Sequence, residues 1–312
     1  MAGEATVELS SLTHRYGDRV ALDRVTLSVD RGAIFALLGP NGGGKTTLFK
    51  ILTTLVKPTS GTARVTGADV VAERNFVRGR IGIVFQKPSL DGSLTVLENL
   101  IHQGHLYGLW GRVLRRRAKE VLKQFRLTDR ANDRVDLLSG GLQRRVELAK
   151  GLLHKPDVLI LDEPSTGLDP GARADLMAHL QVLRDREGVT SLLTTHLMDE
   201  ADRCDRVGIL DEGRLVMLGT PSDLKATVGG DVVTIHGGNP DALAARANEK
   251  FVCKSQVVDG AVRIERERGH EFVPQLIEAF PGEIDSVTVG KPTLDDVFLH
   301  HTGHRLWIGG GA

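Results

Sequence analysis

The sequence predicts an α/β fold: a mostly parallel sheet with an antiparallel β segment before it, a helical subdomain within it and a small α+β domain after it. Three observations support this prediction. Short apolar runs, typical of strands buried on both faces, recur along the first part of the chain. Stretches of helical periodicity separate these runs, which indicates parallel strands joined by helices. Near the C-terminus the order becomes strand, helix, strand, strand, helix, strand.

The predicted parallel strands are short and mostly apolar. They are IFALL (34–38), IGIVF (81–85), VLILD (158–162), TSLLTTH (190–196) and RVGILD (206–211). The segment before them reads as short antiparallel strands, with turns near Gly17 and Gly32. Within it Val25, Leu27 and Val29 alternate with polar residues, as in a half-buried strand.

A helix is predicted directly after the glycine-rich turn at 39–44. Its apolar positions follow helical spacing, and they are Leu48, Ile51, Leu52 and Leu55. We expect Pro58, with the lysine before it, to end this helix. Helical periodicity returns over about residues 94–154, which predicts a helical subdomain. The predicted division is 1–228 for the main domain and 229–312 for the accessory α+β domain.

Composition narrows the class of protein. The 312 residues are enough for two domains, and the 40 basic residues equal the 40 acidic residues. This balance argues against a broad nucleic-acid interface, so we expect no nucleic-acid partner. Cys204 and Cys253 suggest a reduced chain without a disulfide framework or zinc site. We expect neither a signal peptide nor a bilayer-spanning segment, and infer that any membrane role requires a partner.

The stretch GPNGGGKTT at 39–47 is the strongest chemical signal. It fits the pattern G-x-x-x-x-G-K-[ST], follows a predicted buried strand and precedes a predicted helix, which is the context that a phosphate-binding loop requires. Its members are Gly39, Pro40, Asn41, Gly42, Gly43, Gly44, Lys45, Thr46 and Thr47. Lys45 is expected to bind the β- and γ-phosphates, and Thr46 to offer a hydroxyl to Mg²⁺.

Carboxylates end another predicted strand, in VLILDEP at 158–164. Ligands of α/β sheets bind at this end of the strands, so Asp162 is expected to hold Mg²⁺. Glu163 is expected to polarise the water that attacks the γ-phosphate. On its own, an Asp-Glu pair after a strand could instead cap a helix. The phosphate-binding loop upstream favours the catalytic interpretation.

Three single residues extend this set. Gln86 follows one predicted strand and is expected to reach the metal ion or the water, whereas His196 ends another and is expected to contact the γ-phosphate. Tyr16 is expected to stack on a base. Taken singly, each has an ordinary structural explanation: a surface glutamine, a satisfied histidine and a core tyrosine. Their position at strand ends, in this order, favours the functional one.

A second possible anion site is LSGGLQRR at 138–145. Ser139 can cap the helix that follows, and the backbone N–H groups of Gly140 and Gly141 then face outward at its positive end. An ordinary helix cap is the alternative. The chain thus contains two predicted phosphate-binding segments about a hundred residues apart.

Taken together, GPNGGGKTT, VFQ, LSGG, VLILDEPSTGLDP and TTH resemble the ATP-binding subunit of ABC transporters over roughly residues 5–225. The resemblance implies a P-loop NTPase fold with an ABC ATPase core, ATP and Mg²⁺ as ligands, and Tyr16 as the adenine-stacking aromatic. It implies that Gln86 and Thr46 join Asp162 at the metal ion. Ser139, Gly140, Gly141 and Gln143 would cover the γ-phosphate held by a second subunit.

Finer features are similar to the daunorubicin/doxorubicin-resistance type of exporter ATPase. They are FQKPSLDGSLTVLENL, LGTPSDLKA and PTLDDVFLHHTG. Two positions depart from the wider family: Gly43 replaces alanine or a similar small residue, and Leu142 replaces the glutamine of LSGGQ. Neither departure predicts inactivation, because Gln143 is adjacent and related exporters vary at that position.

The resemblance implies an ATPase that dimerises when it binds ATP and powers export of a drug or other hydrophobic compound through a separate transmembrane permease. It places the chain at the cytoplasmic face of the cell membrane. The alternative is a soluble ABC regulator that is not coupled to transport. Intact Glu163 and His196 argue against a regulator that only senses nucleotide. The cargo and the role of the accessory domain are not evident from the sequence.

Overall fold

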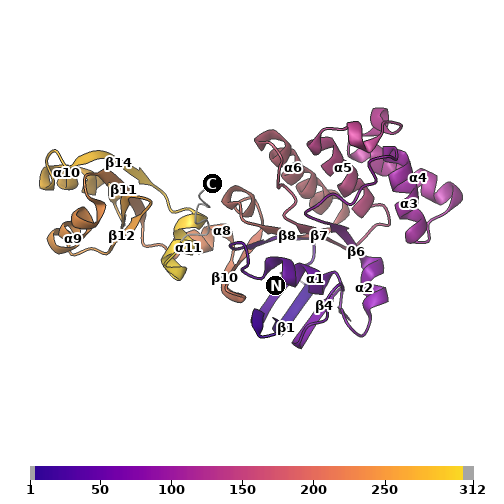
Figure 1. The fold of residues 1–312 in the computed structure, drawn as a ribbon, viewed down its shortest axis with the longest axis horizontal. Helices are drawn as coiled ribbons and strands as arrows, with labels where there is room; N and C mark the ends of the chain where they lie inside the picture. The colour runs from indigo at the N-terminus through magenta and orange to yellow at the C-terminus, as the bar shows by residue number, and fades with distance from the viewer. Residues whose placement is uncertain (1–3, 305–312) are drawn as a thin grey trace. The chain divides into compact units, whose positions relative to one another are not determined.

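The computed structural model describes residues 4–304, and contacts divide the chain into two units, of which the first ends at Leu218 and the second begins at Gly219 (Figure 1). The sequence placed this division after residue 228. The difference arises because α8 (Pro221–Ala226) packs against α11 (Leu294–Thr302) within the second unit. Among the described residues, no helix combines the length and the apolar character needed to cross a membrane.

A six-stranded sheet forms the centre of the first unit, in the order β10-β9-β3-β8-β7-β6. Its strands are β3 (Ile34–Leu38), β6 (Ile81–Val84), β7 (Val158–Asp162), β8 (Thr190–Thr195), β9 (Arg206–Asp211) and β10 (Arg214–Gly219). The pairs β9-β3, β3-β8, β8-β7 and β7-β6 are parallel, as predicted. Every residue of β3, β7 and β8 is buried, which explains their apolar sequences.

A second, antiparallel sheet has the order β2-β1-β4-β5. Its strands are β1 (Ala5–Tyr16), β2 (Arg19–Asp30), β4 (Ser60–Val65) and β5 (Ala68–Asp69). The turn at Gly17 lies where the sequence predicted it, but β1 and β2 are long strands of 12 residues rather than short ones. They continue through irregularities in their pairing, near which Ser11 and Arg24 adopt positive φ angles.

Helix α1 (Lys45–Leu52) contacts strands of both sheets and completes the core between them. The sequence predicted that this helix would continue beyond Leu55, and this was wrong. It ends early because Thr54 adopts a left-handed backbone, with φ of 61°, after which the Leu55 N–H turns back to the Lys50 oxygen at 2.8 Å. Leu55 consequently lies on the surface.

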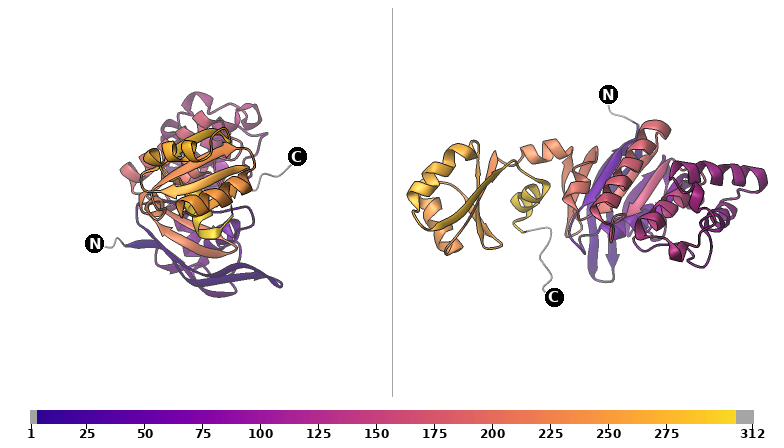
Figure 2. Two further views of the ribbon diagram at one scale, coloured as in Figure 1. Left: turned by 90° about the vertical axis from the view of Figure 1, so that its left-hand side faces the viewer. Right: turned by 90° about the horizontal axis from the view of Figure 1, so that it is seen from above.

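The remaining helices of the first unit pack on the six-stranded sheet or on one another. They are α2 (Arg74–Arg80), α3 (Val96–Leu106), α4 (Gly111–Gln124), α5 (Gly140–Gly151), α6 (Pro170–Glu187) and α7 (Met198–Ala201), with short 3₁₀ turns at Thr128–Arg130 and Val135–Leu137. Helix α6 lies along the sheet and contacts β3 and β8 (Figure 2). Helices α3, α4 and α5 pack together as a helical group at one side of this unit (Figure 1).

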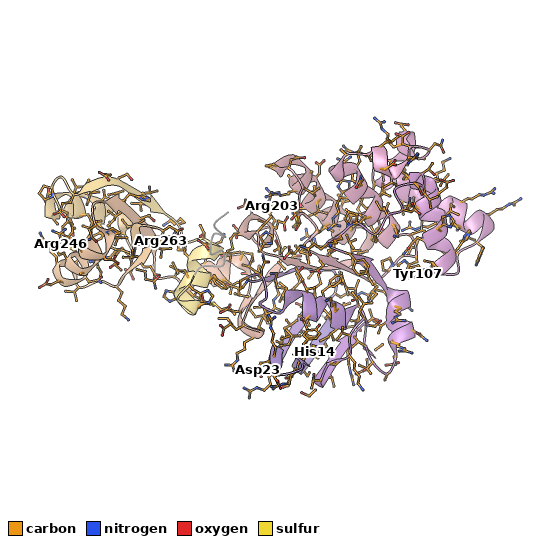
Figure 3. All side chains as sticks on the ribbon, viewed as in Figure 1. His14, Asp23, Tyr107, Arg203, Arg246 and Arg263 are labelled. Atoms are coloured by element: carbon orange, nitrogen blue, oxygen red, sulfur yellow. The ribbon has the colours of Figure 1, made fainter. Side chains whose placement is uncertain are left out.

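The second unit contains the predicted βαββαβ arrangement. Its elements are β11 (Asp231–Gly237), α9 (Pro240–Phe251), β12 (Ser255–Val258), β13 (Ala261–Arg266), α10 (Gly269–Ala279) and β14 (Ile284–Gly290). The strand order is β12-β13-β11-β14, with antiparallel pairing. Helix α11 follows, and its Asp296 lies 3.0 Å from Arg263 of β13 (Figure 3). The predicted domain 229–312 extends past the described residues.

Candidate functional site

The glycine-rich turn at 39–44 connects β3 to α1 at the end of the central sheet. Its backbone passes so close to neighbouring segments that side chains do not fit. A Cβ on Gly39 would lie 2.2 Å from the Leu210 oxygen, and one on Gly44 would lie 2.6 Å from the Ala21 oxygen. Gly44 also has φ of 104°. The loop therefore wraps tightly, with the positive N-terminal end of α1 behind it, which is an arrangement suited to phosphate.

Lys45 begins α1 and is almost fully buried. Its Nζ donates to the oxygens of Gly39 and Pro40, at 2.8 and 3.0 Å, and lies 3.6 Å from Glu163 Oε1. Burial lowers the pKa of this ammonium, and the charge of Glu163 opposes the shift. The rest of the predicted segment lies alongside: Asn41, Gly42 and Thr46 are exposed, Pro40 and Thr47 are half-buried, and Gly43 is buried.

Asp162 ends β7, and Glu163 follows directly. Both are positioned by Thr194 of the neighbouring strand β8: its hydroxyl donates to Asp162 Oδ1 at 2.6 Å and accepts from the Glu163 backbone N–H at 2.9 Å. Burial raises the pKa of Asp162, although the hydrogen bond from Thr194 opposes this. Thr194 was not singled out in the sequence, because its contribution depends on strand register.

The carboxylate of Glu163 is the meeting point of the predicted site. Its Oε2 accepts from Gln86 Nε2 at 3.1 Å and from the Thr166 hydroxyl at 3.3 Å, and lies 3.4 Å from His196 Nδ1. The contact with His196 lowers the pKa of Glu163 against the effect of burial, and the charge of Lys45 adds to this. A carboxylate that stays ionised beside polar side chains can accept a proton or orient water.

The backbone of Glu163 is unusual for a residue other than glycine. Its φ of 41° lies in the left-handed region, where contact between Cβ and the backbone costs about 1–2 kcal/mol. Such conformations persist where surrounding contacts fix them. Here the hydrogen bond from the Glu163 N–H to Thr194 is one of those contacts.

Tyr16 lies at the end of β1, where the β1–β2 turn approaches the phosphate-binding loop: Arg19 Nη2 is 3.5 Å from the Gly42 oxygen. The Tyr16 side chain is 46% exposed, and the buried ring of His14, labelled in Figure 3, packs edge-on against the Tyr16 ring at 4.5 Å. An exposed aromatic ring held by a buried neighbour offers a face for stacking. The sequence did not identify His14 or Arg19.

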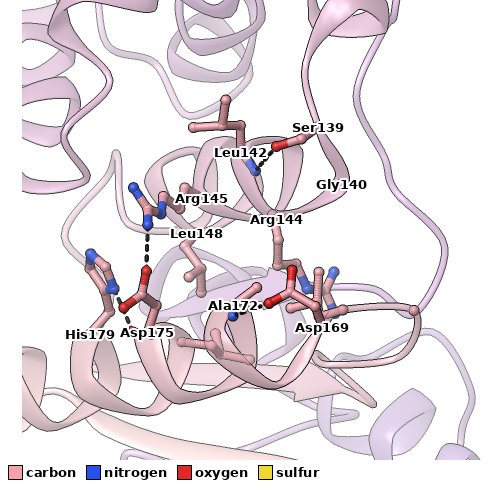
Figure 4. Close-up of a pocket in the computed structure, with 14 residues that line it drawn as sticks. Ser139, Gly140, Leu142, Arg144, Arg145, Leu148, Asp169, Ala172, Asp175 and His179 are labelled. Atoms are coloured by element: carbon pink, nitrogen blue, oxygen red, sulfur yellow. Dashed lines mark hydrogen bonds and ion pairs between the residues drawn. The ribbon is translucent and has the colours of Figure 1, made fainter.

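Ser139 caps α5, and its hydroxyl accepts from the Leu142 N–H at 3.4 Å. Ser139 and Gly140 are exposed and line a hollow of about 340 Å³ (Figure 4). The far wall comes from the loop at 167–169 and from α6, where Asp169 caps the helix. The hydrogen bonds of Lys45 in the phosphate-binding loop involve none of these residues, so the two predicted phosphate-binding segments form separate surfaces of one chain.

Gln143 points away from this hollow. Its Nε2 donates to the backbone oxygens of Val135 and Leu138, both at 3.1 Å. These bonds hold the turn that leads into α5. The side-chain amide of Gln143 is therefore hydrogen-bonded to its own chain.

Arg144 is a buried residue that sequence reasoning missed. Its guanidinium donates to the backbone oxygens of Phe85, which precedes Gln86, and Pro164, which follows Glu163, and it pairs with Glu147. Glu147 in turn accepts from the Ser89 N–H at 2.6 Å. One helix, α5, thus links three segments: the serine cap, the loop after β6 and the loop after β7. Residues 143–145 read QRR, a pattern typical of an exposed helix face, so the sequence did not indicate this role for Arg144.

The fold and these contacts define a P-loop ATPase with an ABC-type nucleotide-binding cassette. Two family profiles match the chain. The family described as "ABC transporter" matches residues 22–166. The family described as "ATP-binding protein DrrA1-3-like, C-terminal domain" matches residues 219–302.

Curated relatives align along almost the whole chain. The daunorubicin resistance ATP-binding protein DrrA3 of Streptomyces coeruleorubidus is 40% identical, covering 96% of each chain. The linearmycin resistance ATP-binding protein LnrL of Bacillus subtilis is 35% identical, covering 96% of this chain and 99% of its own. The Nod factor export ATP-binding protein I of Sinorhizobium fredii is 42% identical, covering 97% of this chain and 88% of its own.

Solved structures agree. The cbiO1 protein of Clostridium perfringens, part of the ABC transporter complex cbiONQ, has a TM-score of 0.67 and 29% identity, covering 80% of this chain and 96% of its own. The cassette MJ0796, a dimer bound to ADP and Pi, has a TM-score of 0.62 and 30% identity, covering 69% of this chain and 98% of its own. The chain belongs to the ABC transporter ATP-binding proteins of the daunorubicin-resistance type, and it is an ATPase subunit.

Proposed function

We propose that the chain powers export of a drug or another hydrophobic compound by hydrolysing MgATP, and that the residues meeting at Glu163 carry out the hydrolysis. The single observation that carries this proposal is the position of that carboxylate within 3.6 Å of Lys45, Gln86 and His196. Gly39–Thr47 would surround the phosphates, with Lys45 paired to them, and Tyr16 would stack on the base. Lys45 currently bonds to loop oxygens, which are acceptors that a phosphate can replace.

The residues present also suit Mg²⁺. Thr46, Gln86 and Asp162 supply hydroxyl, amide and carboxylate oxygens, which are the ligands that this ion prefers. Among the described residues there is no cluster of three or more His, Cys, Asp or Glu side chains able to hold a metal ion. A site formed by Thr46, Gln86 and Asp162 fits an ion that is bound by few protein groups together with substrate phosphates. Bound Mg²⁺ would neutralise charge on the phosphates.

Glu163 is the proposed general base. It is held ionised by His196 and Lys45, and it would accept a proton from water as that water attacks the γ-phosphorus and the bond to ADP breaks. Gln86 and Thr166 bond to the carboxylate and would orient it. His196 would contact the γ-phosphate.

The second surface, at Ser139, would complete the site of another copy. Ser139 and Gly140 are exposed and lie in a separate hollow from the phosphate-binding loop. In a head-to-tail pair the serine hydroxyl and the N–H groups of Gly140 and Gly141 would face the γ-phosphate held by the partner. Gln143 would support this surface by fixing the turn before α5. A similar cassette, MJ0796, forms a dimer in a post-hydrolysis state bound to ADP and Pi, which supports the formation of a pair.

Export would require a separate transmembrane permease, with this chain bound at the cytoplasmic face of the membrane. Names of the relatives support export of antibiotics or of other compounds: daunorubicin and linearmycin resistance, and Nod factor export. The helical group α3–α5 lies beside the loop after Gln86, and Lys150 of α5 bonds to Ser89 in that loop. Movement of a permease against this group would therefore reach Gln86.

Light scattering with the variant Glu163→Gln tests the proposal. The amide keeps the size of the side chain but cannot accept the proton, so hydrolysis should fall by roughly 10²–10⁴-fold while ATP still binds. The variant should form a dimer in ATP and a monomer in ADP. Adding Ser139→Arg should prevent the dimer without changing ATP affinity. A mass that is independent of nucleotide, or of Ser139, would contradict the paired site.

A further inference from the structure

Helix α4 carries a line of positive charge on its outer face. Arg112, Arg116, Lys119 and Lys123 are separated by four, three and four residues, a spacing that places all of them on one side of a helix. All of these residues are exposed. At 1.5 Å per residue the line is roughly 16 Å long. The opposite face consists of Leu114, Ala118, Val121 and Leu122, which are buried against the helical group.

This positive charge is not neutralised within the helix. Glu120 is the one acidic residue of α4, and it pairs first with Arg117, at 3.1 Å, a side chain that is largely buried. Its contact with Arg116 is longer, at 3.8 Å, and the Arg116 side chain is 76% exposed. The whole chain has equal numbers of acidic and basic residues, so the excess of positive charge on this face is local and is balanced by acidic residues elsewhere.

Three large apolar side chains lie exposed beside the N-terminal end of this line. Leu106 is 83% exposed, Trp110 62% and Val113 53%; Leu106 ends α3, Trp110 directly precedes α4, and Val113 lies in the first turn of α4. The ring of Trp110 stacks on His105 at 4.1 Å, which fixes its orientation. A tryptophan beside lysines and arginines is typical of surfaces that lie in the headgroup region of a bilayer.

We propose that the outer face of α4, together with Leu106, Trp110 and Val113, binds the surface of a membrane that contains anionic phospholipids. The cations would lie against lipid phosphates, while the apolar side chains would enter the headgroup layer. Charge complementarity favours this occupant, and the exposed apolar turn favours it over a purely polyanionic partner such as nucleic acid. The binding requires neither nucleotide nor permease, so it goes beyond the proposed export function.

Tryptophan fluorescence of the full-length chain tests this surface directly. The sequence has two tryptophans, Trp110 and Trp307, so Trp307→Phe leaves Trp110 as the only reporter. Adding vesicles of equimolar phosphatidylcholine and phosphatidylglycerol should shift the emission to shorter wavelength. Vesicles of phosphatidylcholine alone should not, and high salt should reverse the shift because it screens exposed charges. An unchanged emission with the anionic vesicles would overturn the proposal.

Matched variants identify the residues involved. Replacing Arg112, Arg116, Lys119 and Lys123 with glutamine keeps helix propensity, and each lost cation should weaken vesicle binding roughly fivefold. The control replaces four exposed cations elsewhere in the first unit with glutamine: Lys57, Arg64, Arg186 and Arg203. It should bind like the parent.

Both variants should keep the parental rate of ATP hydrolysis, because α4 provides no residue of the proposed nucleotide site; this also verifies that they are folded. Equal vesicle binding by the two variants would overturn the assignment to α4. Tight binding to double-stranded DNA without a shift in Trp110 emission would assign the charge to a different partner and likewise overturn it.

Discussion

The guanidinium of Arg144 donates to the backbone oxygen of Phe85 at 2.8 Å, although 59 positions separate the two residues. Phe85 directly precedes Gln86, which bonds to Glu163. The same guanidinium bonds to the oxygen of Pro164, on the other side of Glu163. A buried cation of the helical group thus holds both loops that carry the proposed catalytic residues.

Arg144→Met should destabilise the protein strongly. It leaves the buried carboxylate of Glu147 without its cation, and breaking such a pair typically costs about 3–5 kcal/mol. The double variant Arg144→Met, Glu147→Met should cost less than Arg144→Met alone. Arg145→Met is the matched control, since Arg145 pairs with the exposed Asp175 and should lose at most about 1 kcal/mol. Urea unfolding measures all three, and equal losses for Arg144 and Arg145 would contradict the expectation.

Lys45→Ala should weaken ATP binding by well over tenfold, because it removes a charge-assisted contact to the phosphates. Lys50→Ala is the control, since Lys50 is an exposed lysine of the same helix. It should bind like the parent in calorimetry. Parental affinity of Lys45→Ala would show that the loop at 39–44 is not the phosphate site.

Asp162→Asn should stabilise the chain in the absence of nucleotide. Burial raises the pKa of Asp162 above its unfolded value, so the ionised carboxylate costs stability at every pH above that folded pKa, including neutral pH. Thermal unfolding at pH 7 should therefore show a higher Tm for the variant. With MgATP the order should reverse, because the parent gains a stabilisation that the variant lacks. A lower Tm without nucleotide would argue that the hydrogen bond from Thr194 outweighs the burial.

His154 should make stability depend on pH between about 6.5 and 4. It stacks on Tyr107 and bonds to the Ile81 oxygen at 2.9 Å, and burial lowers its pKa to about 4. Below pH 6.5 the unfolded chain gains a proton that the folded chain does not bind, so stability falls as the pH falls. The loss at pH 5 is about 2 kcal/mol from this group. His154→Phe should show a shallower pH dependence in urea unfolding between pH 7 and pH 5; an unchanged slope would exclude His154 as its source.

A chain that ends at Leu218 should still bind ATP, because every residue of the proposed nucleotide site lies in the first unit. A chain that ends at Ala226 should bind ATP equally well but be less soluble. It keeps α8, whose Leu224 is buried in the full chain, and removes α11, against which that helix packs. Calorimetry and light scattering would distinguish the two. Loss of ATP binding by the folded shorter chain would show that the second unit contributes to the site.

Sequence predicted the parts of the fold and site that depend on local pattern. The buried strands, the glycine-rich loop and the carboxylates at 162–163 are contiguous motifs. Their structure depends mainly on residues that are neighbours in the sequence. The end of α1 was predicted wrongly, because the left-handed backbone of Thr54 ends the helix although its apolar stripe continues through Leu55. Helix α11 was not identified as a helix, since its burial depends on α8, which is far from it in the sequence.

Contacts made across long separations could not be predicted in this way. Arg144 and Gln143 are adjacent and both polar, yet one is buried among distant loops and the other bonds to the turn just before it. Only the direction of each side chain on α5 distinguishes them. Thr194 likewise acts through its register with Asp162 on the neighbouring strand.

The left-handed backbone at Glu163 also limits how this site can evolve. A single base change in a glutamate codon reaches Asp, Gly, Ala, Val, Lys or Gln. Valine, branched at Cβ, is the one poorly tolerated at a φ of 41°, so it would reduce folding as well as chemistry. Lineages in which a copy of this cassette loses hydrolysis but keeps nucleotide binding should therefore carry Gln, Asp or Gly here far more often than Val.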